Sequence, residues 1–300
     1  MPWDESLVNS LVYDAPDPKE GRVLPYVKAV HEALDLALTH DPSVFVYGQG
    51  VDDPSAMFGC TRGLKEKHGN ARVFDTPVAE ESLTGIGTGA AMNGMRPFYM
   101  HNRPDFILLT FNQLVNHASK YHYMDNGLTR VPLVIWAAIG RGWGSGSQHS
   151  QAIQGLLLGA PGLKIVMPST PHDAKGLTLA AIADNNPVLI FEHRWLMKKD
   201  GIVPEGHYTV PIGKGIVRRP GKDVTVVGAS HAIELASQAA QAVAKEGIDC
   251  EVIDLRTVKP IDEAIIEKSL AKTGRLVVVD TGWMMGGVCA ETVSYTHLTL

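Results

Sequence analysis

Apolar runs of strand length alternate with helix-like stretches along most of this sequence. The runs at 44–51 and 132–140 are largely apolar at both odd and even positions, whereas 26–40 repeats its apolar residues at helical spacing. Strands that are apolar on both sides are typical of parallel sheets covered by helices on both faces. The sequence therefore predicts an α/β fold built on mostly parallel sheets.

A change in composition divides this alternation into two parts. Residues 198–220 are rich in glycine, proline and charge and have no helical period, which is typical of a domain boundary. We expect no helix after Gly287, because the run ETVSYTHLTL has no apolar stripe, and the second domain is therefore expected to be incomplete. The predicted segments are an irregular leader at 1–24, a first domain at 25–200, a linker at 201–222 and a second domain at 223–300.

Charge and hydropathy argue against several classes of protein. The net charge of -5 comes from interspersed residues, so no basic surface for nucleic acid is expected. The apolar run 132–140 is too short to cross a bilayer and the acidic N-terminus does not resemble a secretory signal, so we expect a cytoplasmic protein with no membrane partner. Cys60, Cys250 and Cys289 are spaced too widely for a disulfide framework or a zinc site, which predicts buried thiols.

Two carboxylates, Glu80 and Glu81, follow the apolar run that begins at Arg72. Ligands of open parallel sheets bind beyond the carboxyl ends of the strands, where each segment turns from strand to helix. This topology makes Glu80 a candidate site residue. The alternative is that both glutamates are solvated residues of a first helical turn, where the helix dipole favours them.

The glycines that follow also have two interpretations. Gly85, Gly87 and Ala90 satisfy the G-x-G-x-x-A form of the dinucleotide-binding fingerprint. A polar stretch separates them from the preceding strand, and the fingerprint requires the strand to lead directly into the glycines. We therefore expect these glycines to permit close packing of a helix.

A glycine-rich loop at 141–151 follows another predicted strand and ends in a cluster of polar side chains. His149 in this cluster can exchange a proton near neutral pH, although an ordinary loop histidine is the alternative. No G-x-S-x-G elbow is present, which argues against a serine hydrolase. His117 and His122 are not spaced to share one helical face, which argues against a metal site that joins them to His149.

Several collinear strings resemble one family. They are FDTPVAE (74–80), DFILLTFNQLVNHASKYHY (105–123), GSGSQHSQ (144–151) and PGLKIVMPSTPHDAKGL (161–177), followed by DNNPVLIFEH and EVIDLRTVKPID. Together they resemble the beta subunit of thiamine-diphosphate-dependent 2-oxoacid dehydrogenases, a group that includes the pyruvate, branched-chain and acetoin enzymes. The resemblance implies a transketolase-like pyrimidine-binding domain followed by a transketolase C-terminal domain.

The resemblance also implies roles for individual residues. Glu80 matches the family glutamate that contacts the aminopyrimidine ring of thiamine diphosphate, and Phe106 matches the aromatic residue that packs against that ring. His149 matches the histidine placed near the reacting carbon and the lipoyl acceptor. Asp184 and Asn186 match a loop that holds a potassium ion in some members.

The sequence departs from the family pattern on the substrate side. Ser82 replaces a glycine and Arg103 replaces an aromatic residue. Arg103, with His101 and Asn102, makes that side of the pocket more polar and cationic than a pocket for aliphatic acids. The substrate-side candidates are His101, Arg103 and Gln148. We therefore expect a more polar or acidic 2-oxoacid as the substrate.

The resemblance implies partners as well. The sequence contains no GDG motif followed by asparagine, which is the magnesium-diphosphate signature of this enzyme class. The chain is thus expected to supply half of the cofactor site, with magnesium held mainly by an alpha subunit in an α2β2 assembly. The acyl acceptor implied is a lipoyl-bearing acyltransferase. Two alternatives are half of a split transketolase or deoxyxylulose-phosphate-synthase-like enzyme, and a non-catalytic structural or regulatory paralogue.

Overall fold

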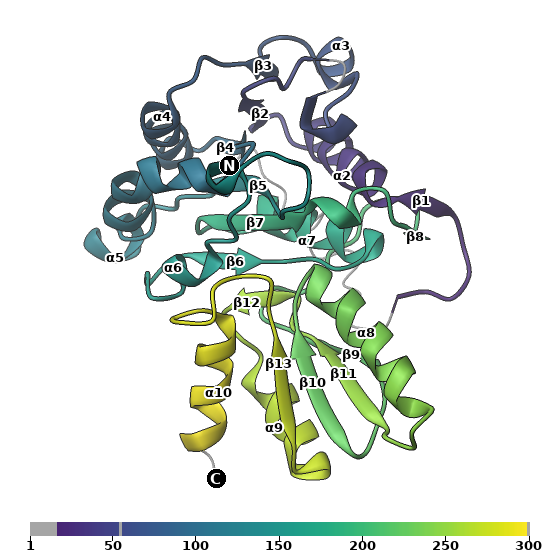
Figure 1. Cartoon of the computed structure of the whole chain (residues 1–300). Helices are drawn as coiled ribbons and strands as arrows, with labels where there is room; N and C mark the ends of the chain where they lie inside the picture. Colours follow the sequence, from purple (N-terminus) through teal and green to yellow (C-terminus); the bar gives the residue numbers. More distant parts are fainter. Residues whose placement is uncertain (1–16, 54–55, 299–300) are drawn as a thin grey trace.

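The computed structural model describes residues 17–53 and 56–298 (Figure 1). Most of the expected leader, residues 1–16, lies outside this part of the chain. Two α/β domains follow one another, the first drawn in purple to teal and the second in green to yellow. None of the described helices is both long enough and apolar enough to cross a membrane.

The first domain is built on a seven-stranded sheet. Six strands run parallel, and the edge strand β12 pairs with β6 in the antiparallel direction. The order across the sheet is β12 (Thr257–Lys259), β6 (Lys164–Val166), β7 (Val188–His193), β5 (Val134–Ile139), β4 (Arg96–Met100), β2 (Val44–Gly48) and β3 (Val73–Asp75).

Alternate side chains of these strands enter two different cores. Val44 and Val46 join the core beneath helices α2 (Tyr26–His40) and α7 (Pro171–Ala183). Phe45 and Tyr47 point the other way, into the core shared with α4 (Glu80–Met92) and α6 (Gln154–Leu158). Burial of both faces explains why these strands carry apolar residues at both odd and even positions.

The second domain contains a four-stranded sheet with one antiparallel edge. Its order is β13 (Leu276–Val279), β10 (Val224–Gly228), β11 (Cys250–Asp254) and β9 (Ile216–Arg219). Its helices are α8 (His231–Ala244), α9 (Glu263–Thr273) and α10 (Val288–Leu298). Strand β9 lies within the stretch 201–222 that the sequence predicted to be a linker, so part of that stretch belongs to the second sheet.

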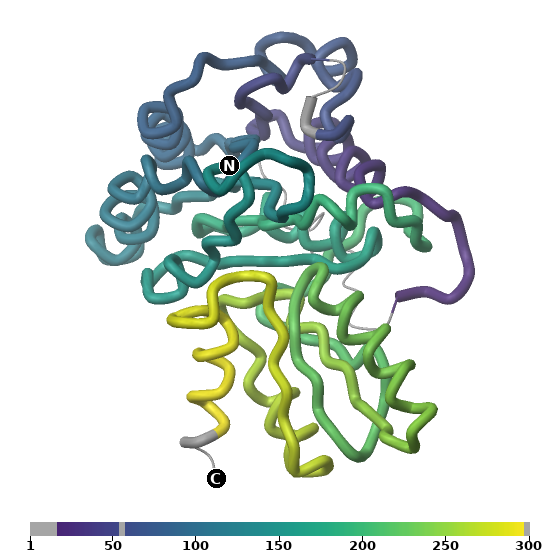
Figure 2. The backbone as a smooth tube through the Cα atoms, viewed as in Figure 1, coloured from purple at the N-terminus to yellow at the C-terminus, as the bar shows by residue number. Residues whose placement is uncertain are grey.

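The two domains are interlocked. Strand β12 comes from the second half of the chain but completes the first sheet, and Ile253 and Leu255 share a core with Ile165 and Leu189. Residues from 17 onward pass beside the second domain before strand β1 (Val23–Pro25) pairs with β8 (Asp200–Ile202) (Figure 2). Segments that are far apart in the sequence therefore lie side by side in the two domains.

The helix expected at 106–123 is interrupted. The structure has a 3₁₀-helix, η2 (Pro104–Thr110), then a π-helix, η3 (Asn112–Ala118), and a short α5 (Tyr121–Met124). The changes in helical winding bury Ile107 and Leu114 in the core while Phe106 faces a cavity. Departures from α-helical winding are frequent near functional sites. The remaining short helices are η1 (Ala56–Gly59), α3 (Leu64–His68), η4 (Ser147–His149) and η5 (Arg194–Leu196).

The expectation that no helix follows Gly287 is wrong, because α10 occupies Val288–Leu298. Its buried positions include Val288, Thr292 and Thr296, which recur every four residues. Threonine does not register as apolar, so the buried stripe is invisible to a hydrophobicity pattern. The expectation of buried thiols holds for Cys60 and Cys250, whereas Cys289 in this helix is partly exposed.

Gly87 allows helix α4 to pack closely on the first sheet, as the sequence predicted for this glycine run. The hydroxyl of Tyr47 donates to the carbonyl of Leu83 at 2.9 Å, and a methyl group at Gly87 would overlap that hydroxyl. We expect Gly87→Ala to lower the free energy of unfolding by about 1–3 kcal/mol, as overpacking does. Denaturant unfolding of the purified chain measures this change.

Gly89 provides the matched control in the same helix. A methyl group there would meet nothing within 4 Å. Gly89→Ala should raise the free energy of unfolding by roughly 0.5–1 kcal/mol, because alanine has the better helix propensity. Equal effects of the two substitutions would contradict the assignment of Gly87 as a packing residue.

Candidate active site

A cavity of about 470 Å³ opens at the carboxyl edge of the first sheet. Gln49 follows β2, Glu80 follows β3, and His101 follows β4. Because these strands are parallel neighbours, their carboxyl ends meet at one edge and bring the three side chains to the same cavity. The topology places the candidate site where ligands of such sheets bind.

Five of the residues predicted from the sequence line this cavity. They are Glu80, His101, Arg103, Phe106 and His149. Gln148 lies in the same short helix as His149, but it is exposed and is not among the described residues that line the cavity. The structure therefore gathers the proposed cofactor residues and two of the three substrate-side candidates.

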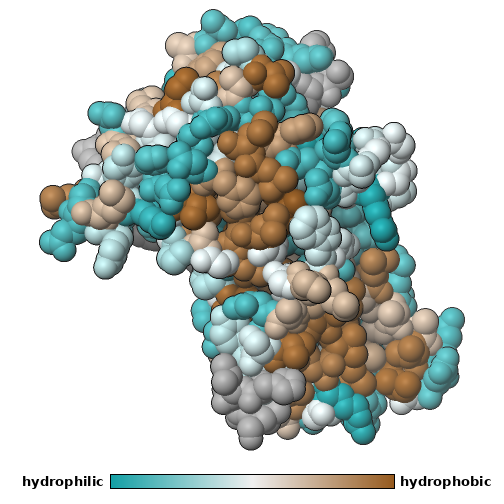
Figure 3. Space-filling model, turned by 60° about the vertical axis from the view of Figure 1, so that its left-hand side comes forward, coloured by the Kyte–Doolittle hydropathy of each residue, from teal (hydrophilic) through white to brown (hydrophobic). Residues whose placement is uncertain are grey.

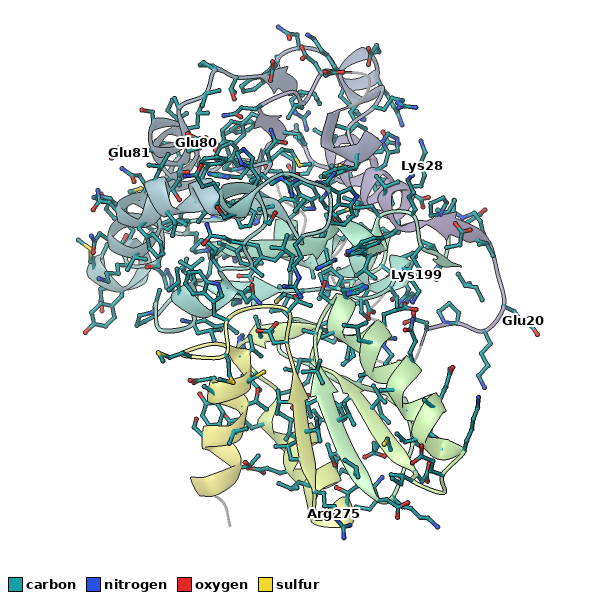
Figure 4. The ribbon with its side chains drawn as sticks, viewed as in Figure 1. Glu20, Lys28, Glu80, Glu81, Lys199 and Arg275 are labelled. Atoms are coloured by element: carbon teal, nitrogen blue, oxygen red, sulfur yellow. The ribbon has the colours of Figure 1, made fainter. Side chains whose placement is uncertain are left out.

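Glu80 is the first residue of α4, and Ala79 precedes it as the cap residue. The positive end of the helix dipole stabilises a carboxylate at this position. The side-chain amide of Gln49 approaches Glu80 Oε1 at 3.5 Å, which leaves the carboxylate available to a ligand. Glu81 is exposed and accepts from Gln113 at 3.0 Å, so the two glutamates face different surroundings (Figure 4).

His149 meets Phe106 across the cavity. Their ring centroids are 5.1 Å apart and the rings are inclined at 76°, an edge-to-face contact. The loop that carries His149 is anchored by Gln151, whose side-chain nitrogen donates to Asp105 at 2.8 Å. Asp105 is buried and adjoins Phe106, so one carboxylate fixes both sides of the contact.

His101 is buried at 4% exposure, and its two ring nitrogens have different surroundings. Nδ1 lies 3.2 Å from the carbonyl of Arg103, so Nδ1 carries the proton. Nε2 has no hydrogen-bond partner among the described residues. Burial lowers the pKa of His101, so the ring is neutral near pH 7 and Nε2 is a buried acceptor without a partner among the described residues.

The backbone around His101 is fixed by neighbouring strand ends. His101 N donates to the carbonyl of Trp136, and the carbonyl of Asn102 accepts from Ala138. Asn102 has a φ of 33°, a conformation that asparagine tolerates better than most residues. Strained conformations of this kind concentrate at ligand-binding sites.

Several cavity residues were missed by sequence reasoning. Gln49, Phe58 and Tyr99 line the cavity, and Arg194 packs against it through Phe58. Arg194 directly follows β7, so applying the strand-end rule to every parallel strand would have found it. Phe58 lies in the short helix η1, which does not directly follow a strand end, so the sequence carries no such signal for it.

The residues predicted for a potassium ion do not fit one. The Asp184 carboxylate is paired with the ammonium of Lys164 and also binds the backbone nitrogen of Asn186 at 2.9 Å. The backbone carbonyl of Asp184 accepts from Arg96 at 2.9 Å. Two cationic side chains thus take the oxygens that a potassium ion would use, and their charge would repel it.

Comparisons with known proteins identify both domains. The family model described as "Transketolase, pyrimidine binding domain" matches residues 23–199, and "Transketolase, C-terminal domain" matches residues 213–299. The chain is 41% identical to 2-oxoisovalerate dehydrogenase subunit beta of Bacillus subtilis, over 91% of this chain and 84% of that protein. It is 40% identical to pyruvate dehydrogenase E1 component subunit beta-1, mitochondrial, of Arabidopsis thaliana, over 88% of this chain and 74% of that protein.

Solved structures show the same fold at lower identity. A split gene transketolase, described as an inactive beta4 tetramer, has a TM-score of 0.74 and 22% identity, over 92% of this chain and 84% of that chain. A transketolase from Leishmania mexicana has a TM-score of 0.69 and 18% identity, over 90% of this chain and 40% of that chain. At these identities the likeness concerns the fold alone. The chain belongs to the family of 2-oxoacid dehydrogenase beta subunits, which combine a transketolase pyrimidine-binding domain with a transketolase C-terminal domain.

Proposed function

We propose that this chain is the beta subunit of a thiamine-diphosphate-dependent 2-oxoacid dehydrogenase. With an alpha subunit it decarboxylates a 2-oxoacid and transfers the acyl group to a lipoyl group on a partner acyltransferase. The observation that carries this proposal is the meeting of Glu80, Phe106 and His149 in one cavity. These residues come from three separate segments of the chain.

The cavity suits the pyrimidine end of thiamine diphosphate. Phe106 and Leu109 provide apolar surface for a heteroaromatic ring, and Glu80 offers a carboxylate to a ring nitrogen. His101, which lines the same cavity, adds a neutral ring to its wall. The diphosphate and magnesium would be held mainly by the alpha subunit.

The residues of this chain have distinct proposed tasks. When bound, the cofactor supplies the carbon nucleophile and the electron sink for decarboxylation. Glu80 holds a proton at the ring nitrogen, which sets the tautomer of the aminopyrimidine. Phe106 fixes the ring plane, and His149 stands at the cavity entrance, where it can donate a proton to the reacting carbonyl oxygen.

An alpha subunit is supported by the relatives, which are named as beta subunits. Figure 3 shows apolar side chains, in brown, gathered over both domains on one side of the molecule. Large exposed apolar side chains include Ile86, Leu109, Trp283, Met284 and Met285. Apolar surface of this kind is typical of protein interfaces, and we propose an α2β2 assembly.

The test uses the chain co-expressed with its alpha subunit. We expect reduction of a redox dye that depends on both thiamine diphosphate and a 2-oxoacid, and light scattering is expected to report an α2β2 mass. A parallel assay with sugar-phosphate donors and acceptors tests the transketolase alternative. Transfer of two-carbon units between sugars, without oxidation of any 2-oxoacid, would overturn the proposal.

A further inference from the structure

A second arginine, Arg194, contacts the wall of the cavity that Arg103 lines, through Phe58. Arg103 follows β4 and Arg194 follows β7, while β5 lies between these strands. Arg103 Nη1 reaches the carbonyl of Ala138 on β5 at 3.4 Å, and Ala138 is the register partner of Glu192 on β7. Both arginines therefore leave the sheet at its carboxyl edge, on either side of the end of β5.

Two aromatic rings contact the guanidinium group of Arg194. Its guanidinium carbon lies 4.3 Å from the ring centroid of Trp143 and 5.1 Å from that of Phe58, which lines the cavity. Cation–π contacts use the face of the guanidinium and leave its in-plane N–H groups available for hydrogen bonding. In the part of the chain that the structure describes, neither Arg103 nor Arg194 forms an ion pair with a carboxylate.

The local charge balance favours an anion. Burial lowers the pKa of Arg103, and the positive charge of Arg194 lowers it further, while Asp105 offsets this in part. Asp105 accepts two hydrogen bonds from Gln151 through Oδ1, while its Oδ2 is buried and bonds to neither arginine. An anion bound between two neighbouring guanidinium groups would relieve their repulsion and satisfy their free donors.

The anion expected between the arginines is not the carboxylate that the substrate loses as carbon dioxide. A strong ion pair with the departing carboxylate would stabilise the ground state over the transition state and slow decarboxylation. A carboxylate at the far end of the substrate changes no charge during the reaction. Binding it there contributes affinity and selectivity at no cost to the chemical step.

We propose that Arg103 and Arg194 together bind the distal carboxylate of a dicarboxylic 2-oxoacid. This inference rests on the proposed function and narrows its substrate class. Neutral aliphatic 2-oxoacids would leave both guanidinium groups without an anionic partner. Arg194 thereby also couples substrate binding to Trp143 in the loop that carries His149.

The test compares substrates of equal chain length in the assembled enzyme. The matched probes are 2-oxoglutarate, with a distal carboxylate, and 2-oxopentanoate, with a methyl group in its place. We expect wild type to prefer 2-oxoglutarate in kcat/KM. Arg103→Gln and Arg194→Met should each lower kcat/KM for 2-oxoglutarate by about tenfold to a hundredfold and change that for 2-oxopentanoate little, because each removes a charge-assisted hydrogen bond.

Two further variants separate charge from structure. Arg103→Lys keeps the charge and should retain part of the preference. Arg141→Gln removes an exposed arginine from the glycine-rich loop and should leave the preference unchanged. A wild-type preference for 2-oxopentanoate would overturn the inference and leave the proposed function intact.

Direct binding distinguishes the remaining outcomes. Calorimetry with glutarate, which cannot react, is expected to show weaker binding to Arg103→Gln and Arg194→Met than to wild type. Equal glutarate affinity in all three would refute the inference, even if no 2-oxoacid is oxidised and the proposed function fails. Weakened binding of thiamine diphosphate with unchanged substrate preference would assign the arginines to the cofactor diphosphate, which also contradicts the inference.

Discussion

Glu80→Gln is expected to lower 2-oxoacid-dependent dye reduction by the assembled enzyme about 10²- to 10⁴-fold, the range for loss of a general acid–base group. Glutamine keeps the shape of the side chain but cannot hold the proton that sets the pyrimidine tautomer. Glu80 is only partly buried, so the fold should tolerate the change. Steady-state rates at saturating cofactor measure the loss, and circular dichroism checks the fold.

Glu81→Gln is the matched control. Glu81 is the next residue of the same helical turn, but it is exposed and bonded to Gln113. Its substitution removes the same charge from the helix N-terminus and should leave the rate within about twofold, because surface substitutions are nearly neutral. Equal rates in wild type and Glu80→Gln would rule out the proposed role and favour a non-catalytic paralogue.

Asp173→Asn is expected to lower the free energy of unfolding by about 3–5 kcal/mol, the usual cost of breaking a buried ion pair from one side. Asp173 is fully buried on α7 and accepts from Arg256 Nε at 2.9 Å. Arg218, from β9, contacts the same carboxylate. The substitution would leave the buried Arg256 without its principal counter-charge at the junction of the two domains, which denaturant unfolding would detect.

Asp249→Asn supplies the comparison for this prediction. Asp249 pairs with Arg219 at 2.9 Å, with both side chains about a third exposed, so Asp249→Asn is expected to lower the free energy of unfolding by only about 0–1 kcal/mol.

Burial raises the pKa of Asp173, but the charge of Arg218, the contact with His172 and the charge of Arg256 outweigh it and lower the pKa. The stabilisation is therefore complete above about pH 3.9, the ordinary value, and is lost as the pH falls further. A gap between wild type and Asp173→Asn that persists through acid unfolding would contradict this account.

Part of the candidate site could be predicted from local sequence. The end of an apolar run marks the carboxyl end of a strand, so Glu80 and the loop of His149 were recognisable as edge residues. The structure brings them to one cavity with Phe106, while their roles in catalysis stay predictions. Gln148 was grouped with His149 by sequence proximity, but adjacent residues of a short helix point in different directions.

Other features depend on contacts that no local pattern records. The threonine stripe of α10 is buried by neighbours from distant segments. Lys164 and Arg96 approach Asp184, a residue predicted to hold potassium, from other strands. Neither approach can be read from the residues around Asp184. Each becomes visible only once the order of the strands is known.

By itself, the sequence determined the α/β class, most of the strands and helices, and the sheet edge at which a ligand would bind. Apolar periodicity and strand ends depend on residues close together in the sequence, so the sequence alone reveals them. Tertiary structure alone decided that β12 completes the first sheet and that Arg194 packs on Phe58, which lines the cavity with Arg103. Strand order and register bring these residues together. Strand order and register in turn follow from the burial of side chains that are far apart in the chain.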